Sequence, residues 1–222
     1  MVAPLRAAFF DVDGVLLDSL PQHLQICRDE ARAFGLQLEV PDVNRFRAMV
    51  SRGTKVSPMS EFFRAVGFPD PYIAQAVAEY ERGFMERYKP RKFGHVDETL
   101  ERLHAAGLQL GLVTSNTRAN VEPALGGAMR YFDPRAVFFF EDGLFSKSKS
   151  ASLVEGARRL GASPAECVYV GDQPADADAA ASAGLRFLGV TYGWGIPQGE
   201  ARFDTVDTVA EIAQRLAGVP AM

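Results

Sequence analysis

The sequence lacks several features that mark whole classes of protein. It has only two cysteines, Cys27 and Cys167, which are far apart and without CxxC spacing, so we expect neither a disulfide framework nor a thiolate metal site. No apolar run approaches the roughly 18 residues that a membrane span needs. The apolar run near the N-terminus is interrupted by Asp11 and too brief for a signal peptide. These absences predict a cytoplasmic protein without a membrane partner.

An excess of positive charge is also missing. The chain has 24 Lys and Arg against 28 Asp and Glu, which gives a net charge of -4. No cationic field therefore indicates nucleic acid as a partner. With 222 residues and 47% hydrophobic content, the chain can form one large domain or a domain with an insert. We expect a monomer or a weak homodimer that binds a small soluble ligand.

Short apolar runs that end in polar or glycine-containing turns recur along the chain. They lie at residues 6–14, 108–116, 136–143, 166–172 and 185–193 and have the composition of buried strands. Helical patterns lie at residues 95–107, 117–125, 150–160 and 175–183. Strands that alternate with helices predict an α/β fold with a doubly wound, Rossmann-like parallel sheet.

One long interval interrupts this alternation. Between the first strand and Val96, roughly seventy residues show helical periodicity and no convincing strand. The expected helices lie at residues 24–35, 59–67 and 72–88. Because a strand and the next helix are normally joined by a few residues, this interval predicts an inserted α-helical domain. The predicted domains are a core of residues 1–18 and 90–222 and a helical domain of residues 19–89.

Polar side chains gather where the predicted strands end. In an open parallel sheet, ligands bind outside the carboxyl ends of the strands. The residues that reach this edge are Asp11, Asp13, Thr114, Ser115, Asn116, Asp172 and Asp176. Crowded carboxylates raise one another's pKa unless a cation neutralises them, and an oxygen-only cluster suits Mg²⁺. Asp11 and Asp172 are the expected side-chain ligands, with the backbone carbonyl of Asp13 as the third.

This cluster has the groups that phosphoryl transfer needs. A carboxylate near a metal can attack phosphorus and form an aspartyl-phosphate, and Asp11 is the candidate nucleophile. Residues i and i+2 of an extended segment point to the same side, so Asp13 can protonate the leaving oxygen and later deprotonate water. Thr114 and a lysine, Lys147 or Lys149, can stabilise the negative charge that develops on the phosphoryl oxygens.

Four motifs follow one another along the chain, and these are "DVDGV", "LGLVTS", "SKSKS" and "GDQPAD". This pattern resembles the haloacid dehalogenase (HAD) superfamily, and the insert after the first motif resembles its helical cap. The family's lysine lies about twenty-five residues before the first aspartate of the last motif, which selects Lys147 as the catalytic lysine. Because "KSKS" replaces the usual K-P-x-P, Lys149 stays open. The family assigns Thr114 to the phosphoryl group and Asp176 to a supporting role.

A closer resemblance is to the branch of phosphoglycolate phosphatases and β-phosphoglucomutases. His23 follows Asp11 by twelve residues, as in many members that act on sugar phosphates, and "VSRGTK" resembles their cap loop. The resemblance implies that His23 lies at the cap hinge and that Arg52 contacts a substrate anion, with Ser115 and Asn116 also at the substrate. Gly171 stands where the mutases usually have a glutamate ligand.

Each motif alone also has an ordinary structural explanation. D-x-D-G is common in turns, and "GDQPAD" can be a turn that starts a helix. A lone histidine can be a packed residue, and Arg45, Arg47, Arg52 and Lys55 can form a solvated helix face. The four motifs in order at strand ends favour a site.

The predicted function is a Mg²⁺-dependent phosphatase that acts on a small phosphorylated metabolite. A phosphomutase with the same intermediate is the alternative, and a non-catalytic regulatory protein that binds a phosphometabolite is the alternative from another class. A dehalogenase is disfavoured because that branch lacks an acid at the position of Asp13.

Overall fold

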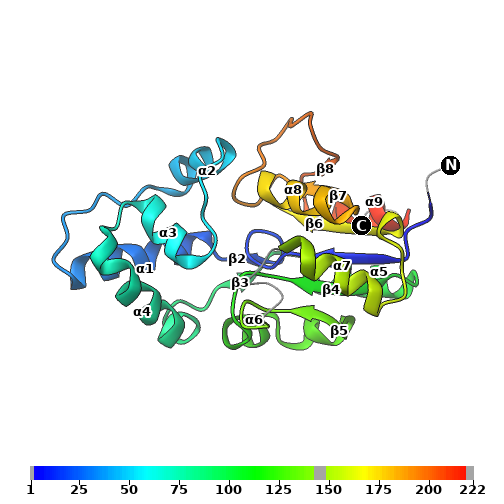
Figure 1. Cartoon of the computed structure of the whole chain (residues 1–222), viewed down its shortest axis with the longest axis horizontal. Coiled ribbons are helices and arrows are strands. Elements are labelled where there is room, and N and C mark those ends of the chain that lie inside the picture. The colour runs from blue at the N-terminus through cyan, green and yellow to red at the C-terminus, as the bar shows by residue number, and fades with distance from the viewer. Residues whose placement is uncertain (1–2, 143–148, 219–222) are drawn as a thin grey trace.

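A parallel β-sheet forms the centre of the structure, a computed structural model that describes residues 3–142 and 149–218 (Figure 1). All strands of this sheet run parallel, and the described strands lie in the order β5 (Phe132–Phe138), β4 (Gln109–Val113), β1 (Ala7–Phe10), β6 (Cys167–Gly171), β7 (Arg186–Val190) and β8 (Thr205–Val206). Because β1 is flanked by β4 and β6, the residues that follow these three strands meet at one edge.

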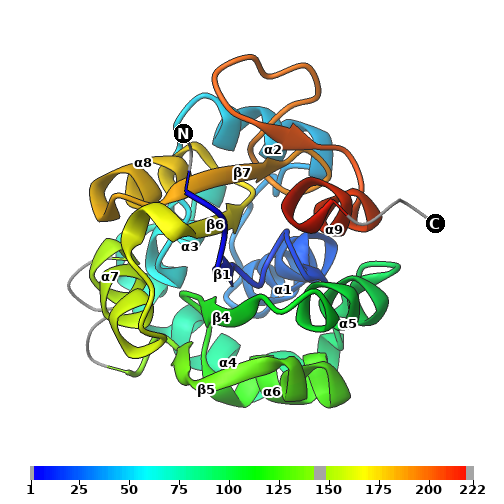
Figure 2. The same cartoon turned by 90° about the vertical axis from the view of Figure 1, so that its right-hand side faces the viewer.

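Side chains of β1 alternate between two layers of helices. Ala8 and Phe10 pack in the cluster that includes α5 (Val96–Ala105), α6 (Arg118–Leu125) and α9 (Val209–Ala217). Ala7 and Phe9 pack in the cluster that includes α7 (Lys149–Arg159) and α8 (Pro174–Ala183). Figure 2 shows α7 and α8 on one side of the sheet and α5 and α9 on the other. Burial of both faces explains why the strands are continuously apolar.

The predicted insert is a separate group of helices, which we call the helical unit (residues 20–88). It consists of α1 (Leu20–Ala33), α2 (Val43–Ser51), α3 (Met59–Val66) and α4 (Asp70–Tyr88), which lie beyond the carboxyl ends of the strands (Figure 1). The short strands β2 (Leu17–Asp18) and β3 (Arg91–Lys92) pair antiparallel where the chain enters and leaves it. The unit has its own aromatic-rich core, which also includes Trp194 from the other part of the chain.

The predicted α/β fold with a parallel sheet is confirmed, and several elements differ in their bounds. β5 starts before the predicted run, at Phe132, and includes Pro134, which an edge strand tolerates because one side of it has no hydrogen-bonded neighbour. The helices α2 and α9 and the short strands β2, β3 and β8 were not predicted. Short helices η1 (Gly126–Tyr131) and η2 (Pro164–Glu166) complete the structure. The predicted domain boundaries stay an interpretation.

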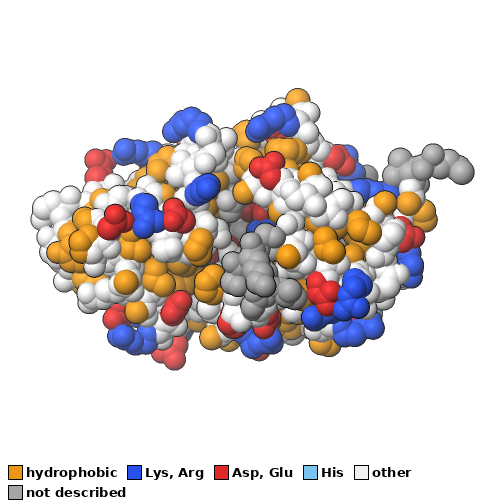
Figure 3. All heavy atoms as spheres, viewed as in Figure 1, with side chains coloured by type: hydrophobic (Ala, Val, Ile, Leu, Met, Phe, Trp, Pro, Cys, Tyr) orange, Lys and Arg blue, Asp and Glu red, His pale blue; other side chains and the backbone are white. Residues whose placement is uncertain are grey.

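The surface shows no segregation of charge on the face drawn in Figure 3, where acidic and basic side chains are interspersed. Among the described helices, none has both the length and the apolar composition needed to cross a bilayer.

The ring of Phe9 lies over a glycine of the neighbouring strand, and this contact yields a prediction on stability. A Cβ on Gly111 would lie 2.4 Å from Cδ1 of Phe9 and 2.9 Å from the carbonyl oxygen of Ala136. We expect Gly111→Ala to lower the free energy of unfolding by about 1–3 kcal/mol through overpacking, measured by urea denaturation. Gly94→Ala is the control, because a Cβ there meets no described atom within 4 Å. A Gly111→Ala protein as stable as wild type would contradict this packing.

Candidate active site

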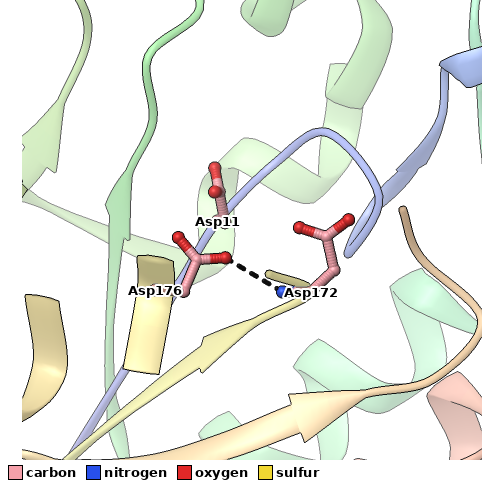
Figure 4. A group of neighbouring side chains, drawn as sticks. All are labelled: Asp11, Asp172 and Asp176. Atoms are coloured by element: carbon pink, nitrogen blue, oxygen red, sulfur yellow. Dashed lines mark hydrogen bonds between the residues drawn. The ribbon is translucent and has the colours of Figure 1, made fainter. Parts of the chain in front are cut away.

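Three carboxylates meet at the carboxyl edge of the sheet. Asp11 follows β1, Asp172 follows β6, and Asp176 lies in the first turn of α8. Each offers an oxygen, and these three oxygens lie within 4.8 Å of one another (Figure 4). All three residues are buried. The expected meeting of Asp11 with Asp172 is therefore present in the structure, and Asp176 joins them.

The turn after β6 explains the position of Asp176. Its Oδ2 accepts a hydrogen bond from the backbone N–H of Asp172 at 3.0 Å (Figure 4). The same oxygen accepts a second hydrogen bond from the backbone N–H of Gln173 at 3.0 Å. Pro174 follows as the first residue of α8, a position where a missing N–H costs nothing. A Cβ on Gly171 would lie 2.5 Å from Cβ of Asp176, so the turn needs glycine there. Asp176 thus supports the turn that presents Asp172.

A lysine lies between two of these acids, and it is Lys149. Its Nζ donates to Oδ2 of Asp11 at 2.7 Å and to Oδ1 of Asp176 at 2.6 Å. Burial opposes the charge of the ammonium, but Asp11 and Asp176 outweigh it, so the pKa of Lys149 is raised well above its usual value. Lys147, the predicted lysine, lies outside the described residues. The geometry therefore favours the alternative that the sequence left open.

The surroundings of Asp11 and Asp172 disfavour the charged forms of these acids. Burial raises the pKa of Asp11 to about 6, although Lys149 opposes this shift. Burial, together with the charges of Asp176 and Asp11, raises the pKa of Asp172 well above its usual range. A single lysine therefore does not neutralise the cluster. A cation beside these carboxylates would restore their charged forms.

The cluster fits a magnesium ion by its chemistry. Its donors are carboxylate oxygens, which Mg²⁺ prefers. Oδ2 of Asp172 accepts from the backbone N–H of Trp194 at 2.6 Å, whereas its buried Oδ1 finds no hydrogen-bond partner among the described residues. A buried oxygen without a partner is costly unless something else binds it. Asp11 and Asp172 are thus suited as ligands, while the contribution of the Asp13 carbonyl stays a prediction.

The carboxylate of Asp13 is held by donors other than those that hold Asp11, Asp172 and Asp176. Its Oδ1 accepts from Oγ of Ser19 at 2.5 Å, and its Oδ2 accepts from Nδ2 of Asn116 at 2.8 Å. The Asn116 amide, predicted at the substrate, therefore holds the proposed acid. Oδ1 of Asn116 in turn accepts from the hydroxyl of Tyr80 on α4 at 3.2 Å, which connects Asp13 to the helical unit.

A cavity of about 450 Å³ opens above these residues, between the core and the helical unit. Asp11, Asp13, Lys149 and Asp176 line its core side, together with Ser115, Asn116 and Gln173. The helical unit and two loops contribute mainly apolar side chains, and these are Val56, Pro58, Met59, Tyr80, Phe140 and Trp194. The cavity therefore joins a charged floor to a largely apolar upper part.

Other predicted site residues have different surroundings. Thr114 directly follows β4 and is fully buried. It does not line the cavity, and its Oγ1 accepts a hydrogen bond from the backbone N–H of Asn116 at 3.1 Å. Arg52 is exposed at the end of α2 and is not among the lining residues. Ser115 does line the cavity. The predicted contacts of Thr114 with the phosphoryl group and of Arg52 with a substrate anion stay predictions.

His23 lines the cavity from the first helix of the unit. Its ring is buried, and Nδ1 donates to the carbonyl oxygen of Ser19 at 2.8 Å. Burial lowers the pKa of His23, which favours the neutral ring. The rings of Phe62, Phe84 and Trp194 surround it, with centroids 4.6–5.4 Å away. His23 thus lies between the residue that binds Asp13 and the aromatic core of the helical unit.

Sequence reasoning missed Trp194 and Tyr80. A signal for Trp194 was present, because the apolar run at residues 185–193 ends directly before it and strand ends point to the site. For Tyr80 we find no such signal, since it lies within the apolar pattern of α4 like any core residue.

The chain is similar to known proteins in sequence. Residues 5–184 match the family of haloacid dehalogenase-like hydrolases. A phosphoglycolate phosphatase of Salmonella paratyphi A is 31% identical over 213 residues, which cover 86% of this chain and 82% of the relative. An N-acetylmuramic acid 6-phosphate phosphatase of Pseudomonas aeruginosa is 26% identical over 222 residues, with coverages of 97% and 94%.

Solved structures share the fold. A haloacid dehalogenase-like family protein of Streptococcus pneumoniae superimposes with a TM-score of 0.75 at 19% identity, over 95% of this chain and 98% of that one. The chain belongs to the haloacid dehalogenase-like hydrolases. The predicted resemblance to the branch of phosphoglycolate phosphatases and β-phosphoglucomutases is confirmed, and the enzyme is a phosphoric monoester hydrolase.

The raised pKa values predict how a metal ion affects stability. Asp11 has a folded pKa of about 6 against an ordinary value of 3.8, so its charged form destabilises the metal-free protein once the pH rises through this window. A Mg²⁺ ion bound at these carboxylates would remove this destabilisation, and below pH ~6 protons would compete with the ion for Asp11. At a hundredfold excess over Kd, about 2.7 kcal/mol of stabilisation should raise Tm by roughly 5–10 °C at pH 7.5, and by less at pH 5.

Thermal unfolding with MgCl₂, against NaCl of equal ionic strength, measures this effect. Asp172→Asn should lose most of the rise, whereas Asp178→Asn, which changes an exposed acid on the neighbouring helix α8, should keep it. An equal rise in Asp172→Asn would place the ion elsewhere.

Proposed function

We propose that this protein is a Mg²⁺-dependent phosphatase that hydrolyses a small phosphorylated metabolite through an aspartyl-phosphate on Asp11. The observation that carries this proposal is the floor of the cavity, where an oxygen of Asp11 lies 2.7 Å from Nζ of Lys149. Asp11 also offers an oxygen within 4.8 Å of one from Asp172 and one from Asp176. Asp13, two residues further along, lines the same cavity.

In the first step, the Asp11 carboxylate attacks the phosphorus atom. The bond between phosphorus and the ester oxygen breaks, and Asp13 gives its proton to that oxygen. The backbone N–H of Val12 and the ammonium of Lys149 hold the two oxygens of Asp11, each at 2.7 Å, and so orient the nucleophile. Ser19 and Asn116 hold Asp13 in the same way.

In the second step, water attacks the phosphorus of the aspartyl-phosphate. Asp13 takes the proton of this water, the bond from phosphorus to Asp11 breaks, and inorganic phosphate leaves. Both side chains return to their starting states. A magnesium ion held by Asp11, Asp172 and the Asp13 carbonyl would supply positive charge that favours the nucleophile's approach to an anionic phosphate.

The site favours a phosphatase over the phosphomutase. The mutase-like members place a glutamate where this chain has Gly171, and a Cβ at this position would lie within 2.5–2.7 Å of three atoms of Asp176. A larger residue would therefore break the turn that presents Asp172. The regulatory alternative is disfavoured because Asp11, Asp13 and Lys149, the residues that the proposed chemistry needs, all line the same cavity.

The cavity also indicates the kind of leaving group. Among its described lining residues, Lys149 has the only side-chain ammonium or guanidinium, and Asp11 and Asp176 already bind it. A carboxylate on the substrate would thus be desolvated without a described cation, which is unfavourable. We therefore propose an uncharged alcohol as leaving group, which would distinguish this enzyme from relatives that are named phosphoglycolate phosphatases.

Phosphate release from a panel of esters tests this function. We expect Mg²⁺-dependent release, at least about tenfold higher kcat/KM for phenyl phosphate or a hexose 6-phosphate than for 2-phosphoglycolate, and no isomerised sugar phosphate. Asp11→Asn should remove turnover while the circular dichroism spectrum stays unchanged. Full activity of Asp11→Asn, or in EDTA, would contradict the mechanism, whereas a preference for 2-phosphoglycolate would contradict only the leaving group.

Substitution of each of the two lysines tests which one acts in catalysis. We expect Lys149→Met to lower kcat by about 10²–10³-fold, because it removes the cation beside the nucleophile. Lys147→Met is the matched control and should stay within a fewfold of wild type. The reverse pattern would restore Lys147 as the catalytic lysine.

A further inference from the structure

The loop after β7, which we call the 192–195 loop, encloses Asp172. The backbone N–H of Trp194 donates to Oδ2 of Asp172 at 2.6 Å, and that of Gly195 donates to its carbonyl oxygen at 3.0 Å. A Cβ on Gly193 would lie 2.3 Å from Cβ of Asp172, so the loop packs directly against this residue. The loop therefore fixes one oxygen of Asp172 and leaves Oδ1, which has no described partner, for a cation.

The helical unit holds the same loop from the other side. The guanidinium of Arg47 on α2 donates to the carbonyl oxygens of Tyr192 and Gly193. The indole of Trp194 is 6% exposed and packs against Phe62 and His23, with ring centroids 5.8 and 5.2 Å away. One loop thus contacts both the proposed metal ligand and the helical unit that lines the cavity.

We propose that Arg47 and Trp194 are positioning residues of the magnesium site, through which docking of the helical unit holds Asp172 in its ligand geometry. This inference rests on the proposed function, because it needs Mg²⁺ at Asp172. If the helical unit moves away, the carbonyl oxygens of Tyr192 and Gly193 lose the guanidinium of Arg47, and the indole of Trp194 loses its aromatic neighbours. The N–H of Trp194 is then free to leave Asp172, whose two oxygens lose their fixed orientation.

The coupling is reciprocal. If docking strengthens Mg²⁺ binding, then Mg²⁺ strengthens docking by the same factor, which is typically about 5–150-fold. The cavity would therefore close preferentially when the ion is present, and water would be excluded when the site is ready for chemistry.

Mg²⁺ titration of the metal-free protein tests this proposal without turnover. The chain has a single tryptophan, so its fluorescence reports on the 192–195 loop alone. We expect Mg²⁺ to shift the emission to shorter wavelength in wild type, and Arg47→Met to raise Kd for Mg²⁺ at least about fivefold. Arg45→Met is the matched control, since Arg45 lies on the same helix and pairs only with the exposed Glu39 among the described carboxylates.

Variants of the tryptophan complete the test, with Kd measured by calorimetry. Trp194→Ala should weaken Mg²⁺ binding as Arg47→Met does, whereas Trp194→Phe keeps an aromatic ring and should stay near wild type. The kcat of Arg47→Met should recover at saturating Mg²⁺. If Arg47→Met and Trp194→Ala fold and bind Mg²⁺ with an unchanged Kd, the positioning roles of these residues are overturned, while Mg²⁺-dependent phosphate release by wild type still supports the proposed function. If wild type shows no Mg²⁺-dependent phosphate release, both the positioning roles and the proposed function are overturned.

Discussion

The repulsion among buried carboxylates at one edge of the sheet is the constraint on which the rest of the structure depends. Asp11, Asp172 and Asp176 each offer an oxygen within 4.8 Å of the others, in surroundings that raise the pKa of Asp11 and of Asp172. Lys149 offsets part of this cost through two short ion pairs. The negative charge that Lys149 does not offset favours the binding of a divalent cation, and such a cation in turn attracts a phosphate.

Four chemically identical side chains suit different proposed functions because different donors hold them. One oxygen of Asp176 accepts hydrogen bonds from the turn after β6, and the other binds Lys149. Asp13 is held by neutral donors away from the cluster, which suits a residue that exchanges protons. Asp172 has one oxygen bound and one without a described partner, as a metal ligand requires. Asp11 faces the cavity between backbone and lysine donors, as a nucleophile must.

The helical unit is connected to this chemistry by polar contacts as well as by packing. Tyr80 reaches Asn116, which holds Asp13, and Arg47 reaches the loop that holds Asp172. His23 lies between these two contacts, with its ring against that of Trp194 and its Nδ1 on Ser19. Contacts therefore connect the helical unit to both Asp13, the proposed acid, and Asp172, the proposed metal ligand. Such contacts suit an enzyme whose substrate must be enclosed before water attacks.

The sequence alone determined the alternation of strands and helices, the helical insert and the meeting of Asp11 with Asp172. These follow from local periodicity and from the rule that parallel strands end at one edge. It selected Lys147 by spacing and left Lys149 open, because two lysines only two residues apart fit the same sequence motif almost equally well. It missed Tyr80 and Trp194 and placed Arg47 only on a solvated helix face, because the contacts of these residues join segments distant in the chain. Only the tertiary structure fixes which oxygen each donor reaches, since that depends on how the helical unit packs over the sheet.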